Sequence, residues 1–113
     1  AERRGTENYA ATEDIIIYKD LILDLASRRL KRKDNLVQLT SAQFEIMRKF
    51  MRNPGRVFTR LELLESFQDM AFEGYERTID VHIKNIRKAL EPDPSHPRYI
   101  KTLWGVGYKL ESE

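Results

Sequence analysis

The residues best equipped to recognise another molecule lie in a segment that starts at Arg77 and ends at Leu90. At about 100° per residue, a helix over this segment places apolar side chains on one stripe and polar side chains on the opposite one. The outer stripe and the threonine beside it comprise Arg77, Val81, Lys84, Asn85, Lys88 and Thr78. Such a surface suits the major groove of duplex DNA. Asn85 can bond adenine with two hydrogen bonds, Val81 can touch a thymine methyl group, and the cations can hold phosphates or reach guanine.

The same stripe has a second interpretation as a solvated face, since most surface helices carry Lys and Arg for solubility. Val81 favours recognition, because a face that only confers solubility has little reason to place a β-branched apolar residue at its centre. His82 lies on the flank of the helix, where a half-buried structural role is one interpretation. A zinc site is the weakest interpretation, because Asp80 and His82 are two residues apart and cannot share a helical face.

Catalysis and cofactor binding find no support elsewhere in the chain. The second histidine, His96, lies in a proline-rich turn beside Ser95, but a serine nucleophile also needs an acid that orients the histidine. The stretch from Gly105 to Gly107 is too short and differently spaced for a dinucleotide-binding loop. The chain has no cysteine, and therefore no thiolate ligand or nucleophile. We expect a protein that is not an enzyme and holds neither a metal nor a cofactor.

Length and composition bound the remaining possibilities. The 113 residues fit one domain without room for a deep catalytic cleft. The 20 basic and 18 acidic residues leave a net charge of +2, which is small for a nucleic-acid binder. No apolar run is long enough to span a membrane and cysteines are absent, so we expect a soluble, cytoplasmic protein. The missing initiator Met and signal segment favour a domain excised from a longer protein.

Hydrophobic alternation predicts that the domain begins with a sheet. Residues 1–13 show no sustained apolar period and are expected to be a linker or a disordered terminus, so that the folded domain spans residues 14–113. Short strands are expected at residues 15–18, 21–25, 28–33 and 36–39, close enough in sequence for a four-stranded antiparallel meander.

Capping boxes predict the starts of two helices after this sheet. The first helix opens at Thr40 and is ended by the Asn-Pro-Gly sequence at residues 53–55. The second opens at Thr59, and its apolar residues at 61, 64 and 67 are expected to share a face. A third helix is expected at residues 77–90, and then a hairpin in which residues 99–104 and 108–110 flank a Gly-Val-Gly turn. This order predicts an α+β winged helix-turn-helix with a C-terminal β-hairpin wing.

Four stretches carry a resemblance to a known family. The most specific are RTIDVHIKNIRKAL at residues 77–90 and IKTLWGVGY at residues 100–108. Leu39-Thr40 with Phe44-Glu45, and Thr59-Arg60 with Leu63-Leu64, are two further anchors. In this order they resemble the DNA-binding effector domain of OmpR/PhoB-type response regulators, the output half of bacterial two-component systems. The first stretch is similar to that family's recognition helix and the second to its wing.

The resemblance implies sequence-specific binding to promoter DNA, usually by two copies arranged head to tail on direct repeats. It also implies an N-terminal receiver domain, outside this chain, whose phosphorylated aspartate controls dimerisation. Residues 1–13 would then be the end of the interdomain linker. By the same analogy, His82 and Arg87 would contact phosphates from the two flanks of the recognition helix. The loop before that helix would touch RNA polymerase through Asp69 and Glu73, although an acidic solvated loop also explains these residues.

The wing is expected to contact DNA through Lys101, Thr102, Trp104 and Tyr108. No acidic residue lies between Arg98 and Lys109, so the hairpin can follow a phosphate backbone or enter a minor groove. Trp104 stands where many members of the family have Arg, a common minor-groove contact. It is expected either to stack on a sugar or wedge at the groove edge, or to pack on the sheet.

The densest basic run, Arg28–Lys33, belongs to the N-terminal sheet in the family layout, away from the recognition helix. We expect it to form a solvated strand edge that discourages aggregation. A contact with the linker, the receiver or a neighbouring subunit is the alternative. For the whole chain, the alternative function is a winged-helix protein-protein interaction module without DNA binding. The small net charge and the acids between Thr59 and Glu76 favour that alternative.

Overall fold

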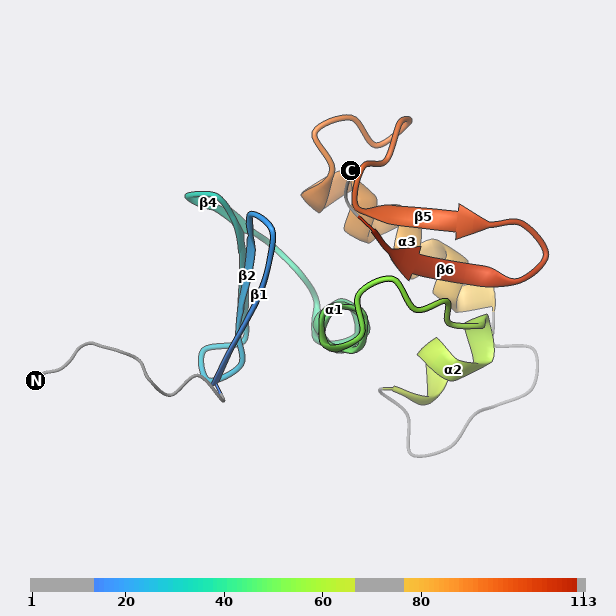
Figure 1. Cartoon of the computed structure of the whole chain (residues 1–113), viewed down its shortest axis with the longest axis horizontal. Helices are drawn as coiled ribbons and strands as arrows, with labels where there is room; N and C mark the ends of the chain where they lie inside the picture. Colours follow the sequence, from blue (N-terminus) through green and yellow to red (C-terminus); the bar gives the residue numbers. More distant parts are fainter. Residues whose placement is uncertain (1–13, 67–76, 112–113) are drawn as a thin grey trace, which may run out of the picture.

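The computed structural model describes residues 14–66 and 77–111 (Figure 1). A sheet comes first, followed by three helices and a hairpin, as the sequence predicts. The strands of the sheet are β1 (Ile15–Tyr18), β2 (Leu21–Asp24), β3 (Arg29–Arg32) and β4 (Asn35–Val37). The helices are α1 (Ser41–Arg52), α2 (Arg60–Glu65) and α3 (Arg77–Leu90), and the hairpin strands are β5 (Ile100–Leu103) and β6 (Gly107–Leu110).

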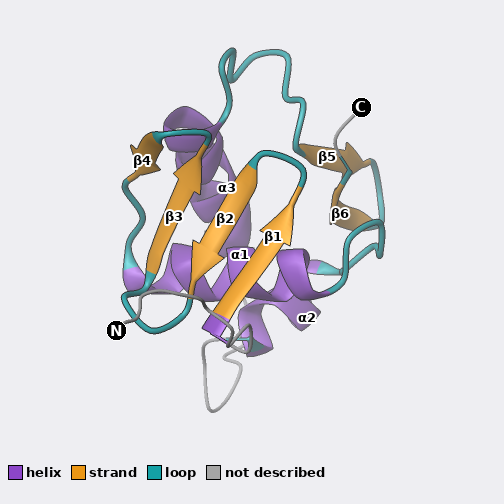
Figure 2. Cartoon of the chain, turned by 60° about the vertical axis from the view of Figure 1, so that its left-hand side comes forward, coloured by secondary structure: helices purple, strands orange, loops and turns teal. Residues whose placement is uncertain are grey.

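The predicted antiparallel meander is confirmed, with the strands in the order β1-β2-β3-β4. Leu21, Leu23 and Leu30 point into the core, whereas Ile22 and Lys31 point outward from the same strands. Seen face on, the sheet lies in front of α1 and α3, so one of its faces is covered and the other is open (Figure 2). The prediction that the basic run forms a strand edge is wrong, because β3 pairs with β2 on one side and β4 on the other.

Both predicted capping boxes are confirmed. At the start of α1, the Gln43 amide donates to Thr40 Oγ1 at 3.2 Å and the Thr40 amide donates to Gln43 Oε1 at 3.1 Å. Thr59 and Glu62 make the same reciprocal pair at the start of α2, and the bond from the Thr59 backbone to the carboxylate is the main cause of a lowered Glu62 pKa. These bonds satisfy amides that have no partner within the helix.

The prediction that residues 61, 64 and 67 form the apolar face of α2 is partly wrong. Leu61 is exposed, and Leu63 and Leu64 are the residues that enter the core. The helix has only six residues, so its buried side is set by where α1 and α3 lie and less by a repeating period. Position 67, the third residue of the expected face, lies outside the described residues.

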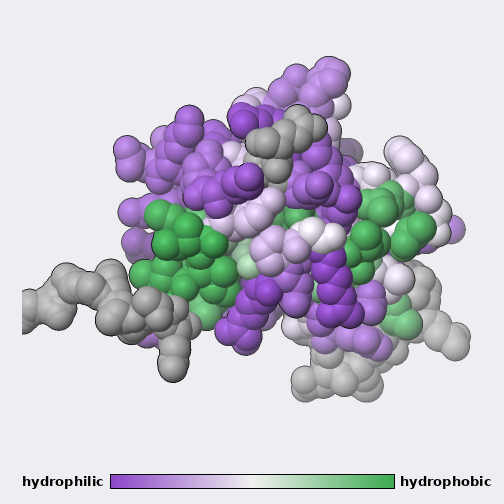
Figure 3. Space-filling model, viewed as in Figure 1, coloured by the Kyte–Doolittle hydropathy of each residue, from purple (hydrophilic) through white to green (hydrophobic). Residues whose placement is uncertain are grey.

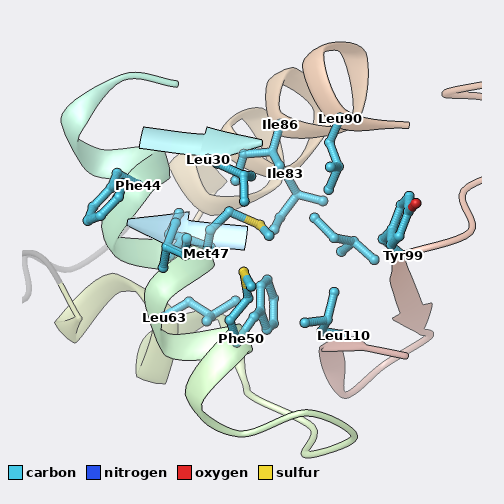
Figure 4. Packing of buried hydrophobic residues seen from close by; sticks show 14 of the residues in the cluster. Leu30, Phe44, Met47, Phe50, Leu63, Ile83, Ile86, Leu90, Tyr99 and Leu110 are labelled. Atoms are coloured by element: carbon cyan, nitrogen blue, oxygen red, sulfur yellow. The ribbon is translucent and has the colours of Figure 1, made fainter. Parts of the chain in front are cut away.

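Side chains from every layer meet in one core (Figure 4). The inner stripe of α3 is buried as predicted, and it consists of Ile79, Ile83, Ile86 and Leu90. Opposite it lie Met47 and Phe50 from α1, and the rings of Phe50 and Phe58 pack edge to face with centroids 6.0 Å apart. Among the described residues, none of the helices has the length and apolar character needed to cross a membrane.

The hairpin is anchored to the core by a backbone bridge. The Phe58 amide donates to the Tyr108 carbonyl at 2.8 Å, and the Tyr108 amide donates back to the Phe58 carbonyl at 3.0 Å. Gly107 permits this approach, because a Cβ there would lie 1.9 Å from the Phe58 carbonyl oxygen. The first strand of the hairpin is shorter than predicted, since Tyr99 precedes β5 and Trp104 lies in the turn, whereas β6 begins one residue earlier than predicted, at Gly107.

Candidate nucleic-acid interface

The outer stripe of α3, defined as Arg77, Val81, Lys84, Asn85 and Lys88, is exposed along its whole length. Val81 keeps 56% of its surface exposed, and Thr78 beside the stripe is exposed as well. Among the described residues, the three cations form no ion pair with a carboxylate. The helix has 14 residues and is therefore about 21 Å long, enough to lie across a major groove. The structure thus brings six of the predicted recognition residues, the outer stripe and Thr78, together on one open face.

His82 is half-buried on the flank of α3. Burial lowers the pKa of its imidazole below the usual value of 6.5, because a charged ring loses hydration there. The ring is therefore neutral at neutral pH. It can hydrogen-bond a phosphate through a ring N–H, but it does not add a full positive charge to the stripe.

Arg87, which the family resemblance assigns to a phosphate, is turned toward the hairpin. Its Nη2 donates to the Ile100 carbonyl at 2.8 Å and to Thr102 Oγ1 at 2.8 Å. Desolvation lowers the pKa of the guanidinium, while Tyr108 and Glu91 act in the opposite direction. Through these bonds, Arg87 and the Thr102 hydroxyl hold β5 against α3. The sequence pattern did not indicate this role.

Asp80 joins α2, α3 and the hairpin at the first turn of α3. Tyr108 Oη donates to Asp80 Oδ1 at 2.5 Å, and Arg60 Nη1 donates to Asp80 Oδ2 at 3.2 Å. Burial and then the bond to Asp80 raise the pKa of Tyr108 to about 12, so its hydroxyl stays a donor at any physiological pH. Asp80, the only acid within α3, is thereby paired with a cation and a hydroxyl. Sequence reasoning placed Tyr108 in the wing but missed this contact, which spans 28 residues.

Glu91 is a second positioning residue that sequence reasoning missed. Its carboxylate is buried and accepts the backbone amides of Arg98 at 2.6 Å, Tyr99 at 3.1 Å and Ile100 at 3.0 Å. In the sequence it is simply the acid that precedes a proline at the end of α3. Its contacts fix the direction in which the chain enters β5, since they satisfy three consecutive amides, the last of which belongs to the first residue of the strand.

The turn of the hairpin is the most exposed part of the wing. Trp104 keeps 90% of its surface exposed and Val106 keeps 55%. The alternative in which Trp104 packs on the sheet is therefore wrong. Lys101 is half-buried and its Nζ donates to the Pro97 carbonyl at 3.1 Å, while Lys109 Nζ pairs with Glu111 at the base of the hairpin.

The basic run Arg28–Lys33 differs from the outer stripe in its contacts. Arg28 pairs with Glu45 Oε2 at 2.9 Å, donates to Ser41 Oγ at 3.2 Å, and lies over the ring of Phe44. The guanidinium of Arg32 donates to the Leu90 carbonyl at the end of α3. Two of the cations thus connect the sheet to the helices. The others, Arg29, Lys31 and Lys33, are exposed.

The turn after α3 brings Ser95, His96 and Asp93 within hydrogen-bonding distance, but without the geometry of a catalytic relay. Ser95 Oγ and Asp93 Oδ2 both approach the same ring nitrogen, His96 Nδ1, at 3.1 and 3.0 Å. A relay needs the acid and the nucleophile on opposite ring nitrogens. All three residues are exposed, and in the described parts of the chain no group of three or more His, Cys, Asp or Glu residues could hold a metal ion. Asp69 and Glu73, the predicted polymerase contacts, lie outside the described residues.

Known proteins are similar to this chain in sequence and in fold. The chain is 35% identical over 113 residues to the transcriptional regulatory protein YcbL of Bacillus subtilis, a match that covers 97% of the chain and 50% of the relative. The response regulator DrrB of Thermotoga maritima, an OmpR/PhoB homologue, has 39% identity and a TM-score of 0.76, covering 88% of this chain and 45% of DrrB. The DNA-binding domain of Klebsiella pneumoniae RstA, solved in complex with the RstA box, has 27% identity and a TM-score of 0.77, covering 86% and 96% of the two chains.

The chain spans about half the length of the curated relatives it matches. A family model described as "Transcriptional regulatory protein, C terminal" matches residues 32–110, which include β4, all three helices and the whole hairpin. The chain therefore belongs to this family of transcriptional regulatory C-terminal domains, and its winged helix fold is that of OmpR/PhoB DNA-binding domains.

Proposed function

We propose that the domain binds promoter DNA in a sequence-specific manner, with α3 in the major groove and the hairpin on the neighbouring backbone and minor groove. The observation that carries the proposal is the outer stripe of α3, which is exposed and cationic and has an amide and an apolar group in its middle. Two similar domains support it, since RstA was solved with the RstA box and AdeR with an intercistronic region. No role in the proposal needs catalysis, a metal or a cofactor.

Within this proposal the α3 residues divide by chemistry. Asn85, Val81 and Thr78 read base edges, because an amide, an apolar group and a hydroxyl match the groups that the major groove presents. Arg77, Lys84 and Lys88 anchor the helix on phosphates, which adds affinity without sequence information. His82 adds a neutral hydrogen bond to a phosphate.

The hairpin residues divide into those that contact DNA and those that position the wing. Lys101 and Trp104 face the duplex from the wing. Thr102 and Tyr108 place the wing through their bonds to Arg87 and Asp80. Arg87 is assigned the same positioning role and not a free phosphate contact, since its Nη2 already has two acceptors.

The setting of the domain follows from the resemblance and is proposed with it. The domain would be the output half of a cytoplasmic two-component response regulator, joined through residues 1–13 to an N-terminal receiver domain. The match to only half of each curated relative supports a longer parent protein. Two copies would bind direct repeats head to tail, which raises the affinity beyond that of one domain. Asp69 and Glu73 would meet RNA polymerase.

A binding titration tests the function directly. Sequences selected by the domain from random DNA would be made as a labelled duplex, and fluorescence anisotropy would be followed at low and moderate salt against a shuffled duplex. The account expects tighter binding to the selected duplex and binding to both that weakens as salt rises. If the domain binds no duplex at low salt, the proposal is wrong.

A protein-binding module is the second candidate, and the outer face of the sheet favours it. Ile17, Ile22 and Leu36 are exposed there and share a cross-strand row with Lys31. Figure 3 shows hydrophobic residues gathered over β1 and β2, at the opposite end of the molecule from the hairpin. This candidate replaces the first only if the same titration shows no salt-sensitive binding to DNA.

A further inference from the structure

The hairpin tip presents an apolar group to solvent with no cover from the described residues. Trp104 is the most exposed large hydrophobic residue of the described chain, at 90%, and Val106 on the other side of Gly105 keeps 55%. The turn between them is tight, because the Val106 amide donates to the Leu103 carbonyl at 2.9 Å and Gly105 adopts a φ of +79°. An indole held in water at the end of a tight turn forgoes the large contact area that aromatic side chains otherwise bury.

The tip is also held in a fixed place relative to α3. At one side the Asp80–Tyr108 bond joins β6 to the first turn of the helix, and farther along Arg87 joins β5 to its later turns. The bridge to Phe58 fixes the hairpin from beneath. The hairpin therefore lies along α3, as Figure 1 shows, and its tip is presented beside the end of α3 that carries Arg77.

The surroundings of the tip suit a nucleic-acid backbone. A hollow lined by Arg60, Asp80 and the tip separates the hairpin turn from the start of α3. Asp80 is paired there with Arg60 and Tyr108, and the hairpin itself has no acid between Arg98 and Lys109. We expect a DNA strand to run over this hollow, with α3 in the groove on one side and the tip in the groove on the other.

We propose that Trp104, supported by Val106, enters the minor groove as a wedge, partly unstacks one base step and bends the duplex. Apolar side chains act in this way in proteins that kink DNA from the minor groove. Pyrimidine–purine steps unstack most easily, so the domain selects such a step at a fixed distance from the base pair that Asn85 contacts. This inference rests on the proposed DNA binding and adds a second, indirect form of sequence selection to it.

The experiment uses the fact that Trp104 is the only tryptophan of the chain. Its emission would be recorded while a duplex labelled at both ends is added, and the anisotropy and the energy transfer between the labels would report binding and bending in the same samples. If Trp104 acts as a wedge, its indole emission should be quenched on binding, and the two labelled ends of the duplex should approach each other. Replacing the pyrimidine–purine step by an A-tract should reduce both changes and weaken binding about tenfold.

Variants separate a wedge from a passive contact. Trp104→Ala should bind about tenfold more weakly and leave the duplex straight, whereas Trp104→Phe should keep most of the bend, because a ring can still stack. Ile17→Ala, which removes a comparably exposed apolar residue from the far end of the molecule, should change neither quantity. DNA binding without indole quenching, or quenching on an unbent duplex, overturns the wedge and leaves the proposed function standing. Absence of any anisotropy change overturns the proposed function, and the wedge with it.

Discussion

The basic run has the higher density of charge along the chain, but the outer stripe of α3 is the surface on which every cation is exposed. Five of the six residues from Arg28 to Lys33 are cationic, whereas the outer stripe of α3 has three cations, Arg77, Lys84 and Lys88, among twelve residues. In the run, Arg28 and Arg32 are committed to Glu45 and to the Leu90 carbonyl. In the stripe, all three cations are exposed and share their surface with an amide.

The difference follows from the two kinds of secondary structure. Successive residues of a strand point to opposite faces, so a continuous basic run is divided between two directions. A helix collects residues three and four apart on one face, so a sparse pattern becomes a continuous surface. If this distinction decides where DNA binds, substitutions in α3 and in the basic run should have different effects.

The largest effect is expected when two cations are removed from each region. Lys84→Ala with Lys88→Ala should weaken binding to every duplex and reduce the slope of log K against log salt by about 1.8, because two phosphate contacts are lost. Arg29→Ala with Lys31→Ala removes the same charge from the run and should leave the slope unchanged. Anisotropy titrations over a series of salt concentrations measure both. Equal slopes for the two double variants would mean that DNA binding depends on the net charge of the domain and not on where the cations lie.

Base readout is the next largest effect. Asn85→Ala should cost about 1–3 kcal/mol on the selected duplex and nothing on a shuffled one, because a bidentate amide–adenine pair is lost at one position. Asn35→Ala in β4 is the matched control, because Asn35 is an exposed asparagine on the sheet. This variant should bind both duplexes as tightly as the parent does. Competition titrations with the two duplexes give the ratio of the affinities for the selected and the shuffled sequence. A loss shared by both duplexes would show that Asn85 reads no base.

Much of the fold and of the outer stripe could be predicted from the sequence, because these features depend on residues close together along the chain. The strands, the capping boxes at Thr40 and Thr59 and the stripes of α3 depend on residues at most a few positions apart. Arg87 and Glu91 act on partners across a turn whose path the sequence does not show. The basic run was misplaced for a different reason, because the predicted meander already implies that its third strand lies between the second and the fourth.

A smaller effect, on the free energy of unfolding, is expected to distinguish Arg87, which bonds to the hairpin, from the exposed Arg77. Arg87→Met should destabilise the domain by about 1–2 kcal/mol, because the Ile100 carbonyl and the Thr102 hydroxyl lose their donor. The buried Nε of Arg87 has no partner among the described residues, and removing it offsets part of the loss. Arg77→Met should change the free energy of unfolding by less than about 0.5 kcal/mol. Urea unfolding measures both. Equal stabilities would contradict the positioning role of Arg87.

The smallest effect concerns His82 and pH. Its folded-state pKa lies below 6.5, so when the pH falls through 6.5 the unfolded chain takes up the proton before the folded one does. The contribution of neutral His82 to stability is therefore complete above pH 6.5 and is lost as the pH falls toward the folded-state pKa. His82→Gln should unfold with a weaker pH dependence in that window. Thermal unfolding at several pH values measures the difference, and identical profiles for the parent and the variant would refute the effect.

The central claim is that the outer stripe of α3, and not the basic run, is the DNA surface. Titration of the ¹⁵N-labelled domain with the selected duplex tests it most directly, since backbone amide shifts report every residue at once. The account predicts that the largest shifts occur from Arg77 to Lys88 and around Trp104, with Arg29 to Lys33 nearly unchanged. Shifts that concentrate on Arg29 to Lys33 while α3 stays unperturbed would contradict it.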